Sequence, residues 1–390
     1  MTLDAKIPLV QRIPSHGEGN LEFWSTPATP YRATDIKEIY RMNVRKSSIH
    51  LVGSIPLENP EEVFRTVATK FGENIRRIPD GETGERHRWI YWQRTMLENH
   101  QSVCVDNNVE PFSLYQWDGK LLRTSELLTF RSDVDPDEVI FETGYDEAAI
   151  SSYQIFCRLK RQGVIDPETL FQVTLPTPIA TGFMYWSPNS RGKFLEIYER
   201  SLLKALYAIL KSIPHDNLCI QWDVCQEVLI FENYFPDRSP DYRNQIINEL
   251  VRLGDEVPET VELGFHLCYG SPADEHLVMP KDTGILVDIM NSIGSGLERR
   301  LNYLHFPVPK DRGDHAYFQP LVNLDSDPDT EIFVGLIHHN DPEGDRARMA
   351  TAQKFLNTFG VATECGWGRT DPERVSGLLD SHLRAITPSI

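Results

Sequence analysis

The chain has 390 residues, of which 40 % are hydrophobic and 10 % aromatic, which suits a large folded core and argues against disorder. Its 39 basic and 57 acidic residues give a net charge of −18. This balance argues against a protein that binds nucleic acid or an anionic membrane, because both partners select a basic surface. The length suggests two or three domains, although a single α/β barrel can also reach this size.

The amino terminus and the cysteines indicate the compartment. Residues 1–20 contain no basic segment followed by an apolar one, so no signal peptide is predicted. The longest uncharged stretch, residues 171–190, contains three prolines and polar side chains, which excludes a membrane helix. The six cysteines lie far apart in the sequence, so a disulfide framework is not expected. We therefore expect a soluble, cytoplasmic protein.

Eight segments begin with apolar or β-branched residues and end in polar or reactive ones, as buried parallel strands do. They span residues 48–57, 74–82, 171–180, 218–227, 261–270, 300–309, 331–340 and 359–368. Helical patterns fall between them, at residues 60–72, 191–212, 241–253, 344–358 and from 371 onward. This alternation predicts a (β/α)8 TIM barrel, whose chemistry lies at the carboxyl ends of the strands.

Two segments do not fit the plain repeat. Residues 1–47 precede the first strand and are expected to form an N-terminal extension to a single barrel domain of residues 48–390. Residues 83–170, with a predicted helix near 146–162, are longer than one crossover needs. Because an insertion after a barrel strand lies on the catalytic face, a lid or pocket wall is predicted, with a purely stabilising subdomain as the alternative.

Three residues form a pattern typical of a metal site. His266 and Cys268 are two positions apart at the end of the fifth strand, so their side chains face the same side. Cys365 ends the eighth strand, which can converge on the fifth across the barrel mouth. One imidazole and two thiolates suit Zn²⁺, and three protein ligands leave a fourth position open, as in catalytic sites. The alternative is a pair of core cysteines and an unrelated histidine.

Four motifs occur in an order that resembles a known family. They are VGSIP (52–56), IQWDVCQE (220–227), FHLCYG (265–270) and ECGWGR (364–369). Across residues 48–385 the chain resembles the cobalamin-independent methionine synthase-like superfamily of TIM barrels, which includes uroporphyrinogen decarboxylase. The resemblance implies that His266, Cys268 and Cys365 bind zinc and that the zinc activates a substrate thiol.

The sequence also departs from that family. Methionine synthases carry a glutamate ligand on the strand after the His-x-Cys pair, and residues 301–309 contain none. His305 or Glu364 is the candidate fourth ligand, unless the position is left to substrate. A His/Cys/Cys site resembles the epoxyalkane:coenzyme M transferases, which are short single-barrel relatives. A methionine synthase with two barrels is not expected, because the chain has room for one.

Further polar residues are predicted at the same face. Arg86 and Arg88 lie in the densest cationic segment, and either is predicted to bind a carboxylate, sulfonate or phosphate, unless both pair with nearby acids. Asp223 or Glu227 is predicted to orient substrate or act as a general base, with a barrel-closing ion pair as the alternative. Weaker candidates are His338 for catalysis and Trp222, Arg312 and Trp367 for substrate contacts.

Three functions remain open on this basis. The first is a zinc-dependent transferase or lyase that makes or breaks a carbon–sulfur bond on a small substrate, anionic and thiol-containing in the simplest case. The second is a metal-free decarboxylase or lyase that uses Arg86, Arg88 and Asp223. The third is a small-molecule-binding barrel without catalysis. The first is the main prediction, with Zn²⁺ as cofactor and without a nucleic-acid or membrane partner.

Overall fold

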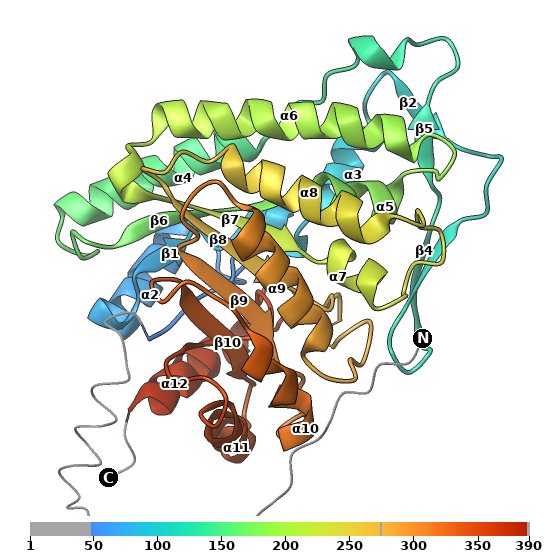
Figure 1. Cartoon of the computed structure of the whole chain (residues 1–390). Helices are drawn as coiled ribbons and strands as arrows, with labels where there is room; N and C mark the ends of the chain where they lie inside the picture. Colours follow the sequence, from blue (N-terminus) through green and yellow to red (C-terminus); the bar gives the residue numbers. More distant parts are fainter. Residues whose placement is uncertain (1–47, 274, 388–390) are drawn as a thin grey trace, which may run out of the picture.

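A curled parallel sheet forms the centre of the protein, and the computed structural model describes it within residues 48–273 and 275–387 (Figure 1). The predicted N-terminal extension, residues 1–47, lies outside the described residues. Seven of the eight predicted strands form this sheet, in the order β1-β6-β7-β8-β9-β10-β11. Their bounds are β1 (Arg77–Pro79), β6 (Leu170–Pro176), β7 (Leu218–Val224), β8 (Glu262–Leu267), β9 (Tyr303–Pro307), β10 (Glu331–Ile337) and β11 (Gly360–Thr363).

The segment predicted as the first strand, residues 48–57, makes isolated bridges instead of a ladder. Ile49 bridges Ile75 beside β1 and also Val361 on β11, so this segment joins the two edges of the sheet. The carbonyl of Val52 accepts hydrogen bonds from the side chains of Gln172 and Gln221, at 2.9 and 2.7 Å. Side chains inside the sheet thus replace backbone partners at Val52, and the backbone bonds of the segment to the two edges are few, such as His50 N to the Val361 carbonyl at 3.0 Å and Ile55 N to the Gly81 carbonyl at 2.8 Å.

Helices cover the outer side of the curled sheet (Figure 1). The helix predicted from residue 60 begins at an Asn59 cap, whose Oδ1 accepts a hydrogen bond from the Glu62 amide at 3.0 Å. The helices between and after the strands are α2 (Pro60–Phe71), α4 (Tyr145–Arg161), α5 (Pro178–Tyr185), α6 (Arg191–Ser212), α7 (Gln226–Phe231), α8 (Tyr242–Asp255), α9 (Gly284–Gly296), α10 (His315–Phe318), α11 (Pro342–Ala352) and α12 (Val375–Ile386). In the described part of the chain, no helix is long and apolar enough to cross a membrane.

Residues 83–170 divide into two parts. The second part is α4, which packs against α2 and α6 and therefore serves as the ordinary crossover helix between β1 and β6. The first part holds α3 (Tyr91–Glu98) and two small antiparallel sheets. One sheet pairs β2 (Val103–Val105) with β5 (Leu128–Phe130), and the other pairs β3 (Phe112–Tyr115) with β4 (Leu121–Ser125). We call the β3–β4 pair, residues 112–125, the roof hairpin.

A buried arginine closes the amino-terminal end of the sheet. The Arg77 side chain is 3 % exposed and pairs with Glu262 and with Glu331, each at 2.6 Å. Its guanidinium also lies 4.4 Å from the centre of the Tyr303 ring. Since Glu262 is on β8 and Glu331 is on β10, this one side chain connects three strands of the sheet.

Replacing Arg77 tests this closure. We expect Arg77→Met to lower the free energy of unfolding by about 3 kcal/mol, because removing this buried guanidinium leaves the half-buried Glu331 without its partner and Glu262 with Arg76 alone. Urea unfolding measures the change. Arg76→Gln is the matched control: Arg76 also pairs with Glu262, but its side chain is 45 % exposed, so a loss below about 1 kcal/mol is expected. Equal losses in the two variants would contradict the account.

Glu227, predicted as a catalytic residue, lies on α7 among the outer helices. Its carboxylate accepts a hydrogen bond from Thr177, and its Oε2 has no hydrogen-bond partner among the described residues. Burial raises the pKa of Glu227 to about 7. Burial, and then the charge of Glu227, raise the pKa of Glu249 on α8 well above its ordinary value. These two carboxyl groups therefore resist ionisation within the helical layer.

Stability should depend on pH through Glu227. Between an unfolded pKa near 4.5 and the folded value of about 7, the folded protein keeps a proton that the unfolded chain releases, so stability falls as pH rises. From pH 5 to pH 8, the wild type should lose about 2 kcal/mol more than Glu227→Gln in urea unfolding. Glu196→Gln, which removes an exposed carboxylate of α6, should keep the wild-type slope. An unchanged slope in Glu227→Gln would show that this carboxyl is not held protonated.

Candidate metal centre

Three side chains from two distant strand ends meet at the carboxyl end of the sheet. His266 lies near the end of β8, Cys268 follows that strand, and Cys365 follows β11. Their ligand atoms all lie within 4.8 Å of one another. The two Sγ atoms are 3.6 Å apart, although the residues are 97 positions apart in the sequence. The alternation along β8 and the curl of the sheet together produce this cluster.

A hydrogen-bonded histidine orients His266. His305 Nε2 donates to the carbonyl of Thr363 at 3.0 Å, because a carbonyl oxygen can only accept. Burial lowers the pKa of His305 well below its ordinary value, so its Nδ1 carries no proton and accepts from His266 Nδ1 at 2.6 Å. Burial also lowers the pKa of His266 to about 4. His266 Nε2 is therefore left with a free lone pair, which is what a metal ligand needs.

Neither predicted fourth ligand offers an atom to the cluster. His305 uses both ring nitrogens, as described above, and supports His266 from behind. Glu364 is directed to two other histidines, with 2.7 Å to His276 Nε2 and 4.0 Å to His338 Nδ1. The described residues thus bring together one imidazole nitrogen and two sulfurs, a donor set that fits Zn²⁺ and leaves one position for another ligand.

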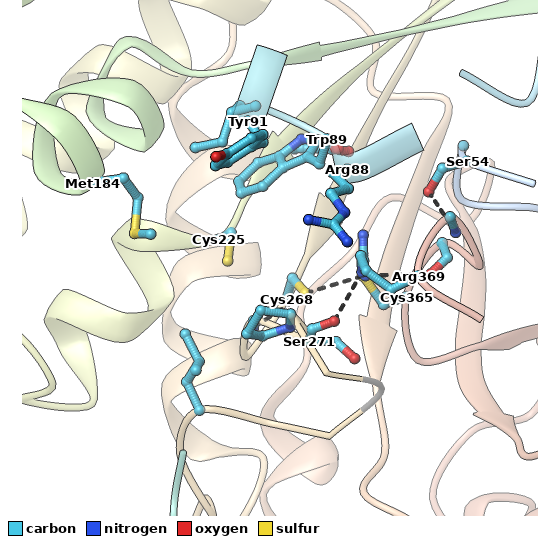
Figure 2. Close-up of a pocket in the computed structure, with 18 of the residues that line it drawn as sticks. Ser54, Arg88, Trp89, Tyr91, Met184, Cys225, Cys268, Ser271, Cys365 and Arg369 are labelled. Atoms are coloured by element: carbon cyan, nitrogen blue, oxygen red, sulfur yellow. Dashed lines mark hydrogen bonds between the residues drawn. The ribbon is translucent and has the colours of Figure 1, made fainter. Parts of the chain in front are cut away.

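A cavity of about 510 Å³ opens beside the cluster (Figure 2). Trp89 and Tyr91, from the segment after β1, form one side of it, and Cys268 and Cys365 lie on the other. Leu114, Leu122 and Arg123 of the roof hairpin and Met184 of α5 add a largely apolar wall. The cavity therefore combines sulfur and imidazole groups at one end with aromatic and aliphatic surface at the other.

Two carboxyl groups also face this cavity. Asp223 accepts a hydrogen bond from Gln221 Nε2 at 2.9 Å, and burial followed by the nearby Glu82 raises its pKa well above the ordinary range. Burial raises the pKa of Glu82 to about 7, although Arg86 opposes the shift. Glu82 was not among the site residues predicted from the sequence. It lies in the turn Asp80–Gly84 at a backbone φ of +47°, and no sequence signal distinguished it from the other acids of this turn.

Two arginines are directed into the cavity near the sulfurs (Figure 2). Arg369 donates to the carbonyl of Ser271 at 2.9 Å and lies 3.3 Å from Cys365 Sγ. Arg88 is the last residue of the short 3-10 helix Gly84–Arg88, and no ion pair to it occurs among the described residues. Arg86, the other predicted anion-binding residue, instead pairs with Asp80 at 2.6 Å. Of the two, Arg88 is the one available to a ligand.

The other predicted site residues do not line the cavity. Trp222 alternates with Asp223 on β7 and is fully buried on the opposite side of that strand. Trp367 donates to Thr363 Oγ1 at 2.7 Å, and His338 Nε2 lies 2.9 Å from the carbonyl of Val308. Arg312 pairs with Asp314 at 2.8 Å. Cys225, which no prediction assigned to the site, also lines the cavity.

Comparison with known proteins supports the fold. No protein-family model and no curated protein matches the sequence. A B12-independent methionine synthase from Shewanella sp. W3-18-1, solved with selenomethionine, is similar in structure, with a TM-score of 0.58 and 14 % identity over 87 % of this chain and 96 % of that one. A putative vitamin-B12-independent methionine synthase from Listeria monocytogenes has a TM-score of 0.50 and 15 % identity, over 88 % and 98 % of the two chains.

A methyltransferase from Methanosarcina mazei is also similar, with a TM-score of 0.50 and 12 % identity over 88 % of this chain and 95 % of that one. Both methionine synthase structures are matched over nearly their whole length, at 96 % and 98 % of their chains. The chain thus has the fold of cobalamin-independent methionine synthase-like and methyltransferase proteins, which its motifs predicted.

Proposed function

We propose that the protein is a zinc-dependent transferase or lyase that forms or breaks a carbon–sulfur bond, with His266, Cys268 and Cys365 as the zinc ligands. The observation that carries the proposal is the convergence of two sulfurs and a lone-pair nitrogen at one end of the cavity. When bound there, zinc would supply the Lewis acidity that stabilises a substrate thiolate at neutral pH.

We interpret the curled sheet with residues 48–57 between its edges as a (β/α)8 barrel, with residues 87–91 and the roof hairpin as its pocket wall.

Other groups that face the cavity suit substrate binding and proton transfer in such a reaction. Arg88 can bind a carboxylate, sulfonate or phosphate of the substrate. Asp223 and Glu82, whose pKa values are raised by burial, can hold a proton near the reacting atoms. The aromatic and aliphatic wall formed by Trp89, Tyr91 and the roof hairpin suits the alkyl part of the substrate.

A metal-free decarboxylase is less well supported. That mechanism needs Arg86 in the site, and Arg86 is instead paired with Asp80 outside the cavity lining. A barrel that only binds small molecules would not need a proton-holding pair beside the sulfurs. The metal-dependent reaction uses more of the groups that face the cavity than either alternative.

Metal content tests the proposal directly. Elemental analysis of the purified protein should find about one zinc per chain, and Cys268→Ser and Cys365→Ser should each weaken zinc binding by at least about 100-fold, because each removes a ligand. Cys157→Ser is the matched control, since Cys157 lies on α4 outside the cavity. A protein that binds no zinc, or ligand variants that bind it as tightly as wild type, would overturn the proposal.

Arg88 should select an anionic substrate group. Isothermal titration of the zinc-loaded protein with 2-mercaptoethanesulfonate and with the neutral 2-mercaptoethanol compares two thiols of similar size. Arg88→Gln should weaken binding of the sulfonate by about 5- to 10-fold, the effect of one partly exposed charge pair, and leave the neutral thiol unchanged. Equal effects on both thiols would show that Arg88 does not contact the anionic group.

A further inference from the structure

The loop between β8 and α9, described for residues 268–273 and 275–283, connects the sulfur cluster to the roof hairpin. Two adjacent residues of this loop make contacts in different directions. Glu275 accepts a hydrogen bond from Gln116 Nε2 of the roof hairpin at 2.8 Å. His276 lies with its Nε2 at 2.7 Å from Glu364 Oε2. The second contact reaches the turn that carries Cys365.

The position of the two sulfurs is not fixed by the sheet alone. β8 and β11 are separated by β9 and β10, so no backbone ladder joins the strand ends that carry Cys268 and Cys365. Both cysteines also lie beyond the last residue of their strands. The Cys268 amide still donates to the carbonyl of Val224 on β7 at 3.0 Å, but this bond does not reach the turn that carries Cys365. Other contacts must therefore hold the two sulfurs at a distance that one metal ion can bridge.

His276 and Glu364 make such a contact between the neighbours of the two cysteines. Glu364 directly precedes Cys365, and Tyr269 directly follows Cys268. The His276 ring packs edge-on against the Tyr269 ring, with 5.4 Å between centroids. His276 is buried and Glu364 half-buried, so water competes little with their ion pair.

We propose that His276 and Glu364 are positioning residues of the metal centre: the contact between their side chains sets the place of Cys365 relative to Cys268. The inference rests on the proposed function, because it concerns the same cluster. It assigns no ligand role to either residue. Groups that support metal ligands without touching the metal change affinity by about 10- to 100-fold when removed, and this is the effect expected here.

Zinc affinity and a cobalt spectrum test the proposal. Competition with a chromophoric chelator should show His276→Ala and Glu364→Ala binding zinc about 10- to 100-fold more weakly than wild type. The double variant should lose no more zinc affinity than the single variant with the larger loss, because the two residues act as a pair. Glu364→Gln keeps the shape and an acceptor oxygen, so it should recover most of the affinity. In the cobalt-substituted protein, the thiolate charge-transfer and ligand-field bands should shift in the alanine variants and return in Glu364→Gln.

Glu275→Gln is the matched control, because it alters the neighbouring residue of the same loop and its contact with the roof hairpin. It should leave zinc affinity and the cobalt spectrum as in wild type. If an alanine variant does not fold, His276→Gln replaces it in the same measurements. A wild-type protein that binds no zinc defeats the proposed function. A wild type that binds zinc, with alanine variants of equal affinity and spectrum or with additive losses, overturns this inference alone.

Discussion

The curl of the parallel sheet is the constraint on which the site depends. Strands β8 and β11 are not neighbours in the sheet, yet the residues at their carboxyl ends bring two sulfurs to 3.6 Å. A flat sheet would place these ends several strand widths apart, at about 4.8 Å per strand. Ile49 maintains the curl by bridging both edges of the sheet, and Arg77 does so at the same, amino-terminal end by pairing with β8 and β10.

Polar side chains fill the inside of the curled sheet, and their hydrogen bonds orient the side chains of the site. Gln221 connects His50, Tyr303 and Asp223, with hydrogen bonds of 2.9, 3.0 and 2.9 Å. Above this group, His305 holds His266 with one nitrogen free. Gly335 makes this possible, since a Cβ at that position would overlap both His305 and the backbone of the Thr363–Glu364 turn. The hydrogen bonds inside the sheet thus determine which nitrogen of His266 is available to a metal ion.

The strand pattern and the His266, Cys268 and Cys365 convergence could be predicted from the sequence, because side-chain alternation is local and a repeated strand–helix pattern implies the strand order of a barrel. The prediction of a regular strand at residues 48–57 was wrong: the segment makes only isolated bridges, and side chains of Gln172 and Gln221 bind its Val52 carbonyl. The role of His305 could not be predicted either, since a ring next to a metal ligand can bind the metal or support that ligand. Only the hydrogen bond from His305 to the Thr363 carbonyl shows that His305 supports His266 and does not bind the metal itself. Glu82 and Cys225 depend in the same way on turns whose direction the sequence does not specify.

Crystals of the purified protein, measured on both sides of the zinc absorption edge, test the central claim most directly. The account predicts one strong anomalous peak about 2.3 Å from the sulfurs of Cys268 and Cys365 and about 2.0 Å from His266 Nε2. His305 and Glu364 should lie outside bonding distance of that peak. A zinc peak elsewhere in the chain would contradict the account. So would crystals grown with zinc in which Cys268, Cys365 and His266 lie together but bind no metal.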